Sequence, residues 1–283
     1  MQFNNKFYEE FSNYIFKHTG IHYAEANYYQ LDARINKLMK FLETDDENEV
    51  LKAIQGGFIK DQRVHQMIVD LATNNETYFF RDPGVFNAIK SELVPQWLEK
   101  IDQGGKVSVW SCASSSGQEI YSIMMNIEEK RPGGIEKGFE FKATDISNSI
   151  LEKAKSGVYS QLEAQRGLPI MMLTKYFKQT DESNWSIRDS FPKKVDFSNF
   201  NLLTGAYPVA QFDLICCRNV LIYQKKENKA MVLGKLYQSL KPGGLLLLGN
   251  TENTFGLNKD FQGQTIGGVA MFQRPLEEKK GAA

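Results

Sequence analysis

The spacing of hydrophobic residues predicts that the first part of the chain is helical. Within residues 1–74, apolar side chains recur three or four positions apart, as at Phe7, Phe11 and Ile15, and the pattern returns between residues 31 and 42. This period places the apolar side chains on one face of an α-helix. We therefore predict a small all-helical N-terminal domain over residues 1–74.

Beyond this region, short apolar runs alternate with segments of helical spacing. The runs at 107–110, 139–145, 212–217 and 245–248 have the composition of buried strands. Strands that alternate with helices are typical of an α/β domain with a mostly parallel sheet. Residues 91–275 are therefore predicted to form a Rossmann-like, doubly wound domain, followed by a flexible tail at 276–283.

A shorter region inside this domain has a different pattern. Between residues 176 and 197 apolar positions alternate with polar ones, as at Trp185 and Ile187 and again at Val195 and Phe197. Alternation with a period of two is typical of strands that have one exposed face. Residues 176–197 are a candidate for a small antiparallel β insertion.

The stretch from Lys106 to Glu119 carries the first sign of a binding site. Val107 and Val109 lead into a run of small residues, and apolar helical spacing begins at about Gln118. A strand, a small-residue turn and a helix form the first unit of nucleotide-binding α/β domains, in which the loop amides meet the ligand. The stretch lacks a G-x-G-x-x-G motif, so a plain structural turn remains an alternative.

Two further groups of polar residues are candidates for ligand binding. Asp145 ends the strand predicted at 139–145, where an acid can accept hydrogen bonds from both ribose hydroxyls. Asn75, Thr77 and Arg81 lie in segment 75–90, between the two predicted domains, and domain junctions often hold ligands. The aromatic residues of that segment also allow a simpler role as an interdomain plug.

Charge and composition narrow the class of partner. Basic and acidic residues both number 34, so the formal net charge is zero and favours neither nucleic acid nor an anionic membrane. No apolar run approaches the length of a membrane-spanning helix, and the N-terminus lacks the apolar core of a signal peptide. We expect a cytoplasmic protein, with Cys112, Cys216 and Cys217 as small core residues. The histidine spacing predicts no metal site.

A row of basic residues marks the second predicted helix. Arg34, Lys37 and Lys40 recur every third position opposite the apolar face of that helix. Such a ridge can be an ordinary solvated face, or a docking surface for an acidic partner. In the second case, Arg34 and Lys37 are the predicted substrate-binding residues.

Six motifs in order resemble those of the CheR-type chemotaxis receptor methyltransferases. The motifs are NETYFFRD (75–82), WSCASSSGQEIYSI (110–123), ATDISNSILEKAKSGVY (143–159), VDFSNFNLL (195–203), FDLICCRNVLIY (212–223) and LKPGGLLLLGNTEN (240–253). The resemblance implies a class I S-adenosylmethionine (SAM) methyltransferase fold. It also implies methyl transfer from SAM to glutamate side chains in the cytoplasmic domain of chemoreceptors, which leaves S-adenosylhomocysteine.

The resemblance also implies roles for individual residues around the methionine half of SAM. Asn75, Thr77 and Arg81 would lie over the cofactor, with Arg81 facing the methionine carboxylate. Glu119 would hold the methionine amino group. Tyr223 would stand near the methyl group and the acceptor, as the catalytic residue.

The remaining implied contacts surround the nucleoside. Asp145 would bind the ribose, and Asn201 and Leu202 would flank the adenine, although core packing explains Leu202 equally well. Arg218 and Asn219 would close the pocket.

The chain departs from the family pattern in two places. Where the family usually has S-T-G-E-E-P, this chain has Gln118 followed by Glu119 and Ile120. The region 176–197 also lacks the glycine-containing hairpin with which some members grip a receptor's C-terminal pentapeptide. The alternatives are therefore a SAM-dependent methyltransferase for another protein or a small acid, and a non-catalytic SAM-binding scaffold. A monomer is expected.

Overall fold

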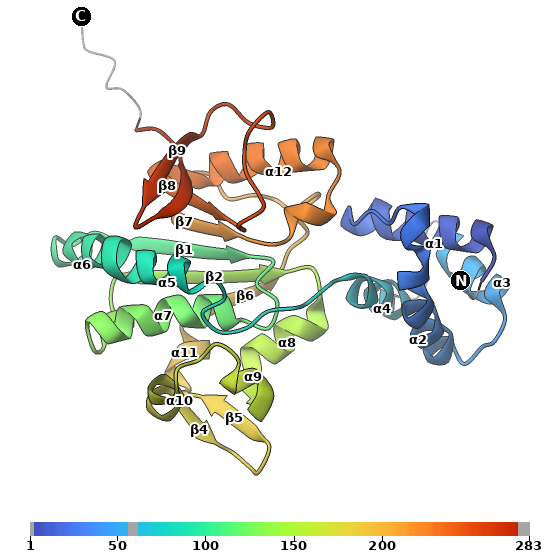
Figure 1. The fold of residues 1–283 in the computed structure, drawn as a ribbon, viewed down its shortest axis with the longest axis horizontal. Coiled ribbons are helices and arrows are strands. Elements are labelled where there is room, and N and C mark those ends of the chain that lie inside the picture. The colour runs from blue at the N-terminus through green and yellow to red at the C-terminus, as the bar shows by residue number, and fades with distance from the viewer. Residues whose placement is uncertain (1–2, 56–61, 277–283) are drawn as a thin grey trace, which may run out of the picture.

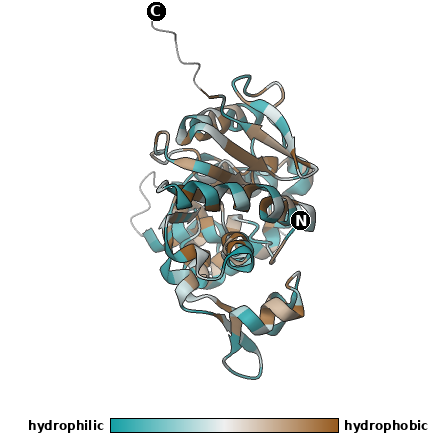
Figure 2. Cartoon of the chain, turned by 90° about the vertical axis from the view of Figure 1, so that its left-hand side faces the viewer, coloured by the Kyte–Doolittle hydropathy of each residue, from teal (hydrophilic) through white to brown (hydrophobic). Residues whose placement is uncertain are grey.

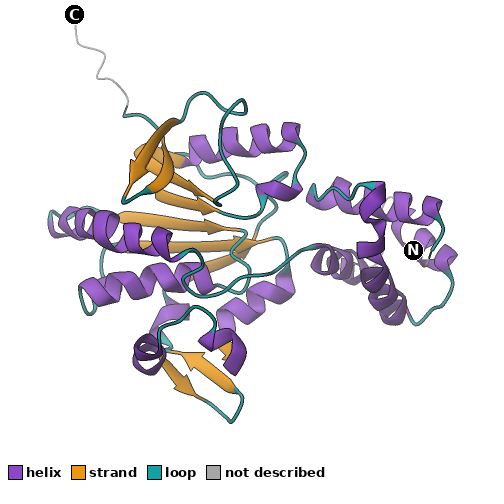
Figure 3. Cartoon of the chain, in the orientation of Figure 1, coloured by secondary structure: helices purple, strands orange, loops and turns teal. Residues whose placement is uncertain are grey.

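The computed structural model describes residues 3–55 and 62–276 (Figure 1). The predicted flexible tail, apart from Leu276, therefore lies outside the described residues. Helices occupy the N-terminal part and a mixed sheet with flanking helices occupies the rest, as the secondary-structure colouring of Figure 3 shows. The predicted combination of an N-terminal helical region with an α/β fold is confirmed.

The N-terminal region is a helical bundle with a core of its own. Its elements are α1 (Asn5–Thr19), a 3₁₀ helix (Glu25–Leu31), α2 (Asp32–Leu42), α3 (Glu47–Gln55) and α4 (Gln62–Ala72). Its core includes Phe7 and Phe11 of α1, Ile35 and Leu38 of α2, and Ile68 of α4. The apolar period of the sequence therefore gives the buried face of these helices.

The larger region is built on a seven-stranded sheet with the order β6-β2-β1-β7-β8-β10-β9. All neighbouring strands are parallel except β10, which runs antiparallel to both β8 and β9. The strands are β1 (Val107–Cys112), β2 (Phe139–Asp145), β6 (Val195–Asn199), β7 (Phe212–Cys217), β8 (Leu240–Leu248), β9 (Gln262–Ile266) and β10 (Val269–Gln273). The strand order reverses next to β1, which creates a crevice at the carboxyl ends of the parallel strands.

Helices cover both faces of the sheet, so its strands are hydrophobic on both sides (Figure 2). One face packs against α5 (Pro83–Ala88), α6 (Val94–Asp102) and α7 (Gln118–Lys130), and the other packs against α12 (Lys226–Ser239). Cys216 belongs to the first core and Cys217 to the second. The prediction that all three cysteines are core residues is confirmed, because Cys112, Cys216 and Cys217 are free and buried.

The small β insertion differs in extent from the predicted 176–197. Its sheet has the order β3-β5-β4 and is formed by β3 (Val158–Ser160), β4 (Phe177–Gln179) and β5 (Asn184–Ile187). Helix α8 (Asn148–Ser156) precedes this sheet in the chain, and α11 (Ser190–Lys193) follows it. Two helices lie between β3 and β4, α9 (Gln161–Gln165) and α10 (Ile170–Tyr176). The three residues of β3 are too few to show alternation, and the alternation at Val195 belongs to β6 of the large sheet.

The strand predicted to start at Leu245 starts earlier, at Leu240. Phe212 pairs with Leu240 and Leu214 pairs with Leu245, so the Lys241–Gly244 segment forms an irregularity inside β8. Gly243 has a φ of +81°, a conformation that favours glycine. In the described part of the chain, no helix has the length and apolar character needed to cross a bilayer.

Candidate cofactor pocket

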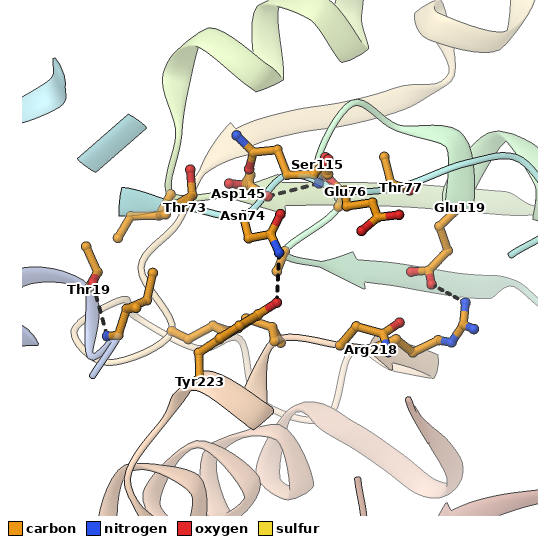
Figure 4. Close-up of a pocket in the computed structure, with 18 of the residues that line it drawn as sticks. Thr19, Thr73, Asn74, Glu76, Thr77, Ser115, Glu119, Asp145, Arg218 and Tyr223 are labelled. Carbon is orange, nitrogen blue, oxygen red and sulfur yellow. Dashed lines mark hydrogen bonds and ion pairs between the residues drawn. The ribbon is translucent and has the colours of Figure 1, made fainter. Parts of the chain in front are cut away.

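One pocket lies at the carboxyl ends of β1, β2 and β7, and the segment that joins the two regions covers it (Figure 4). The end of α1 contributes Thr19 to its wall. All predicted cofactor residues and the predicted catalytic tyrosine line it, whereas Arg34 and Lys37 do not. These lining residues are Asn75, Thr77, Arg81, Glu119, Asp145, Asn201, Leu202, Arg218, Asn219 and Tyr223.

The loop after β1 is tied to both neighbouring segments. The backbone N–H of Ser115 donates to the Asp145 carboxylate at 2.9 Å, and its side-chain hydroxyl donates to the carbonyl of Asn75 at 2.9 Å. Ala113 and Ser115 have φ values of 52° and 50°, in the left-handed region that is costly for residues with a Cβ. Such conformations persist where the surrounding contacts impose them, and they cluster at functional sites.

Three further residues with left-handed backbone conformations border the same pocket region. Phe80 and Asp82 have φ values of 53° and 65°, and Asn219, which lines the pocket, has a φ of 58°. Among the described non-glycine residues, only Glu43 and Ala210 share this conformation elsewhere. Strained backbone conformations are therefore concentrated around the pocket, where the surrounding contacts impose them.

Asp145 is a buried carboxylate at the tip of β2. Its two oxygens accept hydrogen bonds from the backbone N–H groups of Ser147 at 3.0 Å and Ser115 at 2.9 Å. Burial raises the pKa of Asp145, and these backbone hydrogen bonds oppose the rise. A carboxylate oxygen can accept more than one hydrogen bond, so Asp145 retains capacity for hydroxyl donors in the pocket.

A buried ion-pair cluster forms the opposite end of the pocket. The Arg218 guanidinium donates to the Glu119 carboxylate at 2.9 Å, to the carbonyl of Arg81 at 3.1 Å and to the Asp82 carboxylate. Ser111 donates to the other oxygen of Glu119 at 2.8 Å. The Arg218 side chain is only 3% exposed, and its Nε has no partner among the described residues. A buried donor without a partner indicates a place where a ligand or water would bind.

Tyr223 stands on the far wall, at the junction with the helical region. It ends the 3₁₀ helix Leu221–Tyr223, and its hydroxyl accepts a hydrogen bond from the Asn74 side-chain amide at 3.0 Å. Its carbonyl accepts from the backbone N–H of His22 at 3.2 Å. The same junction contains Gly20, where a Cβ would lie 2.0 Å from the Gln224 side-chain oxygen.

Asn201 and Leu202 lie beside this junction. The Asn201 side-chain amide donates to the carbonyl of His18 at 2.7 Å and accepts from the backbone N–H of Leu203 at 2.8 Å. Both the nitrogen and the oxygen of the Asn201 amide are therefore engaged by the protein, and the contact with His18 links this wall of the pocket to α1. Leu202 lines the pocket and also packs against the core on the α12 side of the sheet, consistent with both of its predicted roles.

The family profile described as "CheR methyltransferase, SAM binding domain" matches residues 75–267. The chain belongs to the CheR methyltransferase family. The match covers every strand of the large sheet except β10 and includes every predicted cofactor residue. The prediction of a SAM-dependent methyltransferase of this family is therefore confirmed.

Full-length relatives extend the likeness to the helical region. A chemotaxis protein methyltransferase of Pseudomonas putida is 35% identical over 93% of this chain and 95% of its own. Another, from Pseudomonas aeruginosa, is 36% identical over 91% of this chain and 94% of its own. A third, from Vibrio parahaemolyticus, is 35% identical over 90% of this chain and 92% of its own.

Two residues that the sequence did not single out contribute to this CheR pocket. Asn74 contacts Tyr223, as described above. The Glu252 carboxylate accepts hydrogen bonds from four backbone N–H groups, those of Asn219, Val220, Ile222 and Gly249, at 2.8–3.1 Å. Glu252 lies inside the motif LKPGGLLLLGNTEN, but the motif alone does not show that its acid holds the loop between β7 and Tyr223.

The departure at Gln118 lies outside the pocket wall. Gln118 is 1% exposed, and its side-chain oxygen accepts a hydrogen bond from the Ser116 hydroxyl at 2.8 Å. The pocket carboxylate of this motif is Glu119. The replacement of an acid by Gln118 therefore leaves the acidic group of the pocket in place.

Arg34, a predicted substrate-binding residue, has a task within the helical region. Its guanidinium donates to the carbonyls of Leu71 and Gln30, and it stands over the Tyr23 ring at 5.6 Å. Lys37, by contrast, is exposed. Within residues 3–55 and 62–276, no three His, Cys, Asp or Glu side chains are grouped as metal ligands would be.

Proposed function

We propose that the protein transfers the methyl group of SAM to glutamate side chains in the cytoplasmic domain of methyl-accepting chemotaxis receptors. The products are glutamyl methyl esters and S-adenosylhomocysteine. The names of the full-length relatives support a chemotaxis role. The observation that carries the proposal is the convergence of Glu119, Asp145, Arg218 and Tyr223 on one pocket of a SAM-binding domain. We place the protein in the cytoplasm and expect it to act as a monomer without a metal.

The chemistry of the pocket suits the separate parts of SAM. The Glu119 carboxylate offers an acceptor for the methionine ammonium, and the guanidinium groups of Arg81 and Arg218 offer donors for the methionine carboxylate. The Nε of Arg218 is a buried donor without a partner among the described residues. Asp145 would accept from the ribose hydroxyls, and Leu202 would provide an apolar wall for the adenine.

Methyl transfer to a glutamate needs no general base. A glutamate side chain has a reference pKa of about 4.3, so at neutral pH it is already ionised. When bound, SAM supplies an electrophilic methyl group. A carboxylate oxygen forms a bond to that carbon, the carbon–sulfur bond breaks, and its electron pair remains on sulfur, so no proton moves.

The task of the protein is therefore to position the carboxylate and to exclude water. The reacting oxygen must lie about 3–3.5 Å from the methyl carbon and in line with the breaking bond. The Tyr223 hydroxyl, which lines the pocket, can orient the glutamate with one hydrogen bond. A single neutral donor positions the nucleophile with less loss of its reactivity than a close ion pair would cause.

The receptor helix would approach from the side of the helical region. Lys37 and Lys40 are exposed on α2, and they form the free part of the basic ridge because Arg34 is engaged internally. Acidic residues flanking a methylated glutamate would be attracted to this surface.

The decisive test is incubation of the protein and SAM with the purified cytoplasmic domain of a chemoreceptor, followed by mass spectrometry. Addition of one methyl group to defined glutamates, reversed by mild alkali, would support the proposal. Methylation of a small acid or of another protein alone would favour a different methyltransferase. SAM binding by calorimetry without turnover on any receptor would favour a scaffold.

A further inference from the structure

Asn74 faces Tyr223 across the pocket in a contact that links the two regions of the protein (Figure 4). Its side-chain Nδ2 donates to the Tyr223 hydroxyl oxygen at 3.0 Å. The backbone on either side is held, because the Thr73 hydroxyl donates to the carbonyl of Asp70 and the Ser115 hydroxyl donates to the carbonyl of Asn75. Asn74 is thus presented to the tyrosine by a fixed segment.

The direction of this hydrogen bond determines what the tyrosine can do. A phenolic hydroxyl has one proton to donate and an oxygen that accepts. Because Asn74 donates to that oxygen, the phenolic proton is free to point elsewhere. Tyr223 itself lines the pocket, so its free O–H is available to a ligand bound there.

We propose that Asn74 is a positioning residue that keeps Tyr223 as a hydrogen-bond donor to the substrate glutamate. This inference rests on the proposed function, because the acceptor must be a carboxylate. If the residue at position 74 accepted a hydrogen bond from the phenol, the phenolic proton would no longer be available to the substrate. The lone pairs of the phenolic oxygen would then face the negatively charged glutamate.

Two substitutions separate the direction of the bond from its mere presence. Asn74→Ala removes the donor and should lower kcat about three- to tenfold, the range of one neutral hydrogen bond. Asn74→Asp keeps the shape but turns the partner into an acceptor, so it should lower kcat by about a further tenfold. The dissociation constant for SAM, measured by calorimetry, should change little in Asn74→Ala.

The same substitutions in a Tyr223→Phe background show whether the effect passes through the phenol. There, both should change kcat by less than about twofold, because no hydroxyl remains to be directed. Simple charge repulsion from Asp at position 74 would persist in that background. An Asn74→Asp enzyme as active as Asn74→Ala, or equal losses with and without the Tyr223 hydroxyl, would overturn the inference.

A second measurement does not depend on turnover. In protein labelled with ¹³C-tyrosine, the Tyr223 Cζ resonance is identified by its absence in Tyr223→Phe. The chemical shift of this resonance should change in Asn74→Ala and change further in Asn74→Asp. In Asn74→Asp it should approach the chemical shift of a phenol that donates its proton to a carboxylate. An unchanged resonance in both variants would refute the contact even if the receptor proved not to be the substrate. A lack of receptor methylation by the wild type, with these shifts present, would refute only the proposed function.

Discussion

Arg218 donates to Glu119 at 2.9 Å and thereby ties the end of β7 to the first turn of α7. Both side chains are largely buried, with exposures of 3% and 14%. In the order of the chain these residues are far apart, and they meet because β1 and β7 are neighbours in the sheet. The pair therefore fixes the geometry of the pocket before any ligand arrives.

We expect Arg218→Ala to destabilise the fold as well as to weaken SAM binding. The substitution leaves the buried Glu119 carboxylate with only the Ser111 hydroxyl, and removal of one partner from a buried pair costs about 3–5 kcal/mol. Denaturant unfolding measures this loss. The exposed pair of Lys193 with Asp189, whose charged atoms are 3.9 Å apart, provides the control, and Lys193→Ala should leave the unfolding midpoint close to wild type. Equal effects of the two substitutions would contradict the assignment.

The buried carboxylate of Asp145 predicts a pH dependence of SAM binding. The ribose hydroxyls must donate to the ionised form, so affinity is full above the pKa of Asp145 in the free protein and falls as the pH drops through it. Because burial raises that pKa, the fall should begin at a higher pH than an ordinary aspartate would give.

Calorimetry across the acidic range tests this dependence, and Asp145→Asn is the control. The variant should bind SAM more weakly by about 1–3 kcal/mol and with a flatter pH profile, since the titrating group is gone. If Asp145→Asn retained the wild-type profile, another group would be responsible.

The sequence was sufficient to predict the pocket residues whose position follows from the order of the strands. Asp145 and Glu119 could be predicted because ligands of open α/β sheets bind at the carboxyl ends of the strands. Asn74 and Glu252 could not, since their roles depend on hydrogen bonds to Tyr223 and to the loop before it, which no local pattern encodes. For the same reason the sequence showed Arg34 as part of a basic ridge but not its contacts with backbone carbonyls.

The limits of the β insertion were missed for a different physical reason. β3 has three residues and pairs with β5, from which two helices and β4 separate it in the chain. A strand this short has too few positions for a period of two to be recognised. The nearby alternation at Val195 and Phe197 reflects a strand of the large sheet, where β6 pairs with β2.

Glu252 provides a test of how the loop before Tyr223 is held. Glu252→Ala leaves four backbone N–H groups without their acceptor, and we expect a loss of about 1–3 kcal/mol in unfolding free energy together with lower turnover. Glu252→Gln, which keeps one acceptor oxygen, should be intermediate. Glu182→Ala, at an exposed turn, is the control in thermal unfolding. A Glu252→Ala protein as stable and active as this control would show that the carboxylate is dispensable.

The last prediction concerns Lys37 and Lys40, the exposed part of the basic ridge on α2. Reversing Lys37 and Lys40 to Glu should raise the KM for the receptor fragment and leave the SAM dissociation constant unchanged, because neither residue lines the pocket. Arg34 is left intact, since its contacts with Leu71 and Gln30 would confuse a loss of folding with a loss of docking. The control is the double reversal of Lys6 and Lys52 to Glu, which changes the net charge by the same amount at exposed positions on α1 and α3.

Salt concentration separates attraction at this surface from a structural effect. Exposed charges are screened over about 10 Å at 0.1 M salt, so the wild-type KM should rise with salt while that of the Lys37→Glu/Lys40→Glu enzyme changes less. The two curves should approach each other at high salt. If the double reversal at Lys6 and Lys52 raises the receptor KM as much as the reversal on α2, the effect comes from net charge and α2 is an ordinary solvated face.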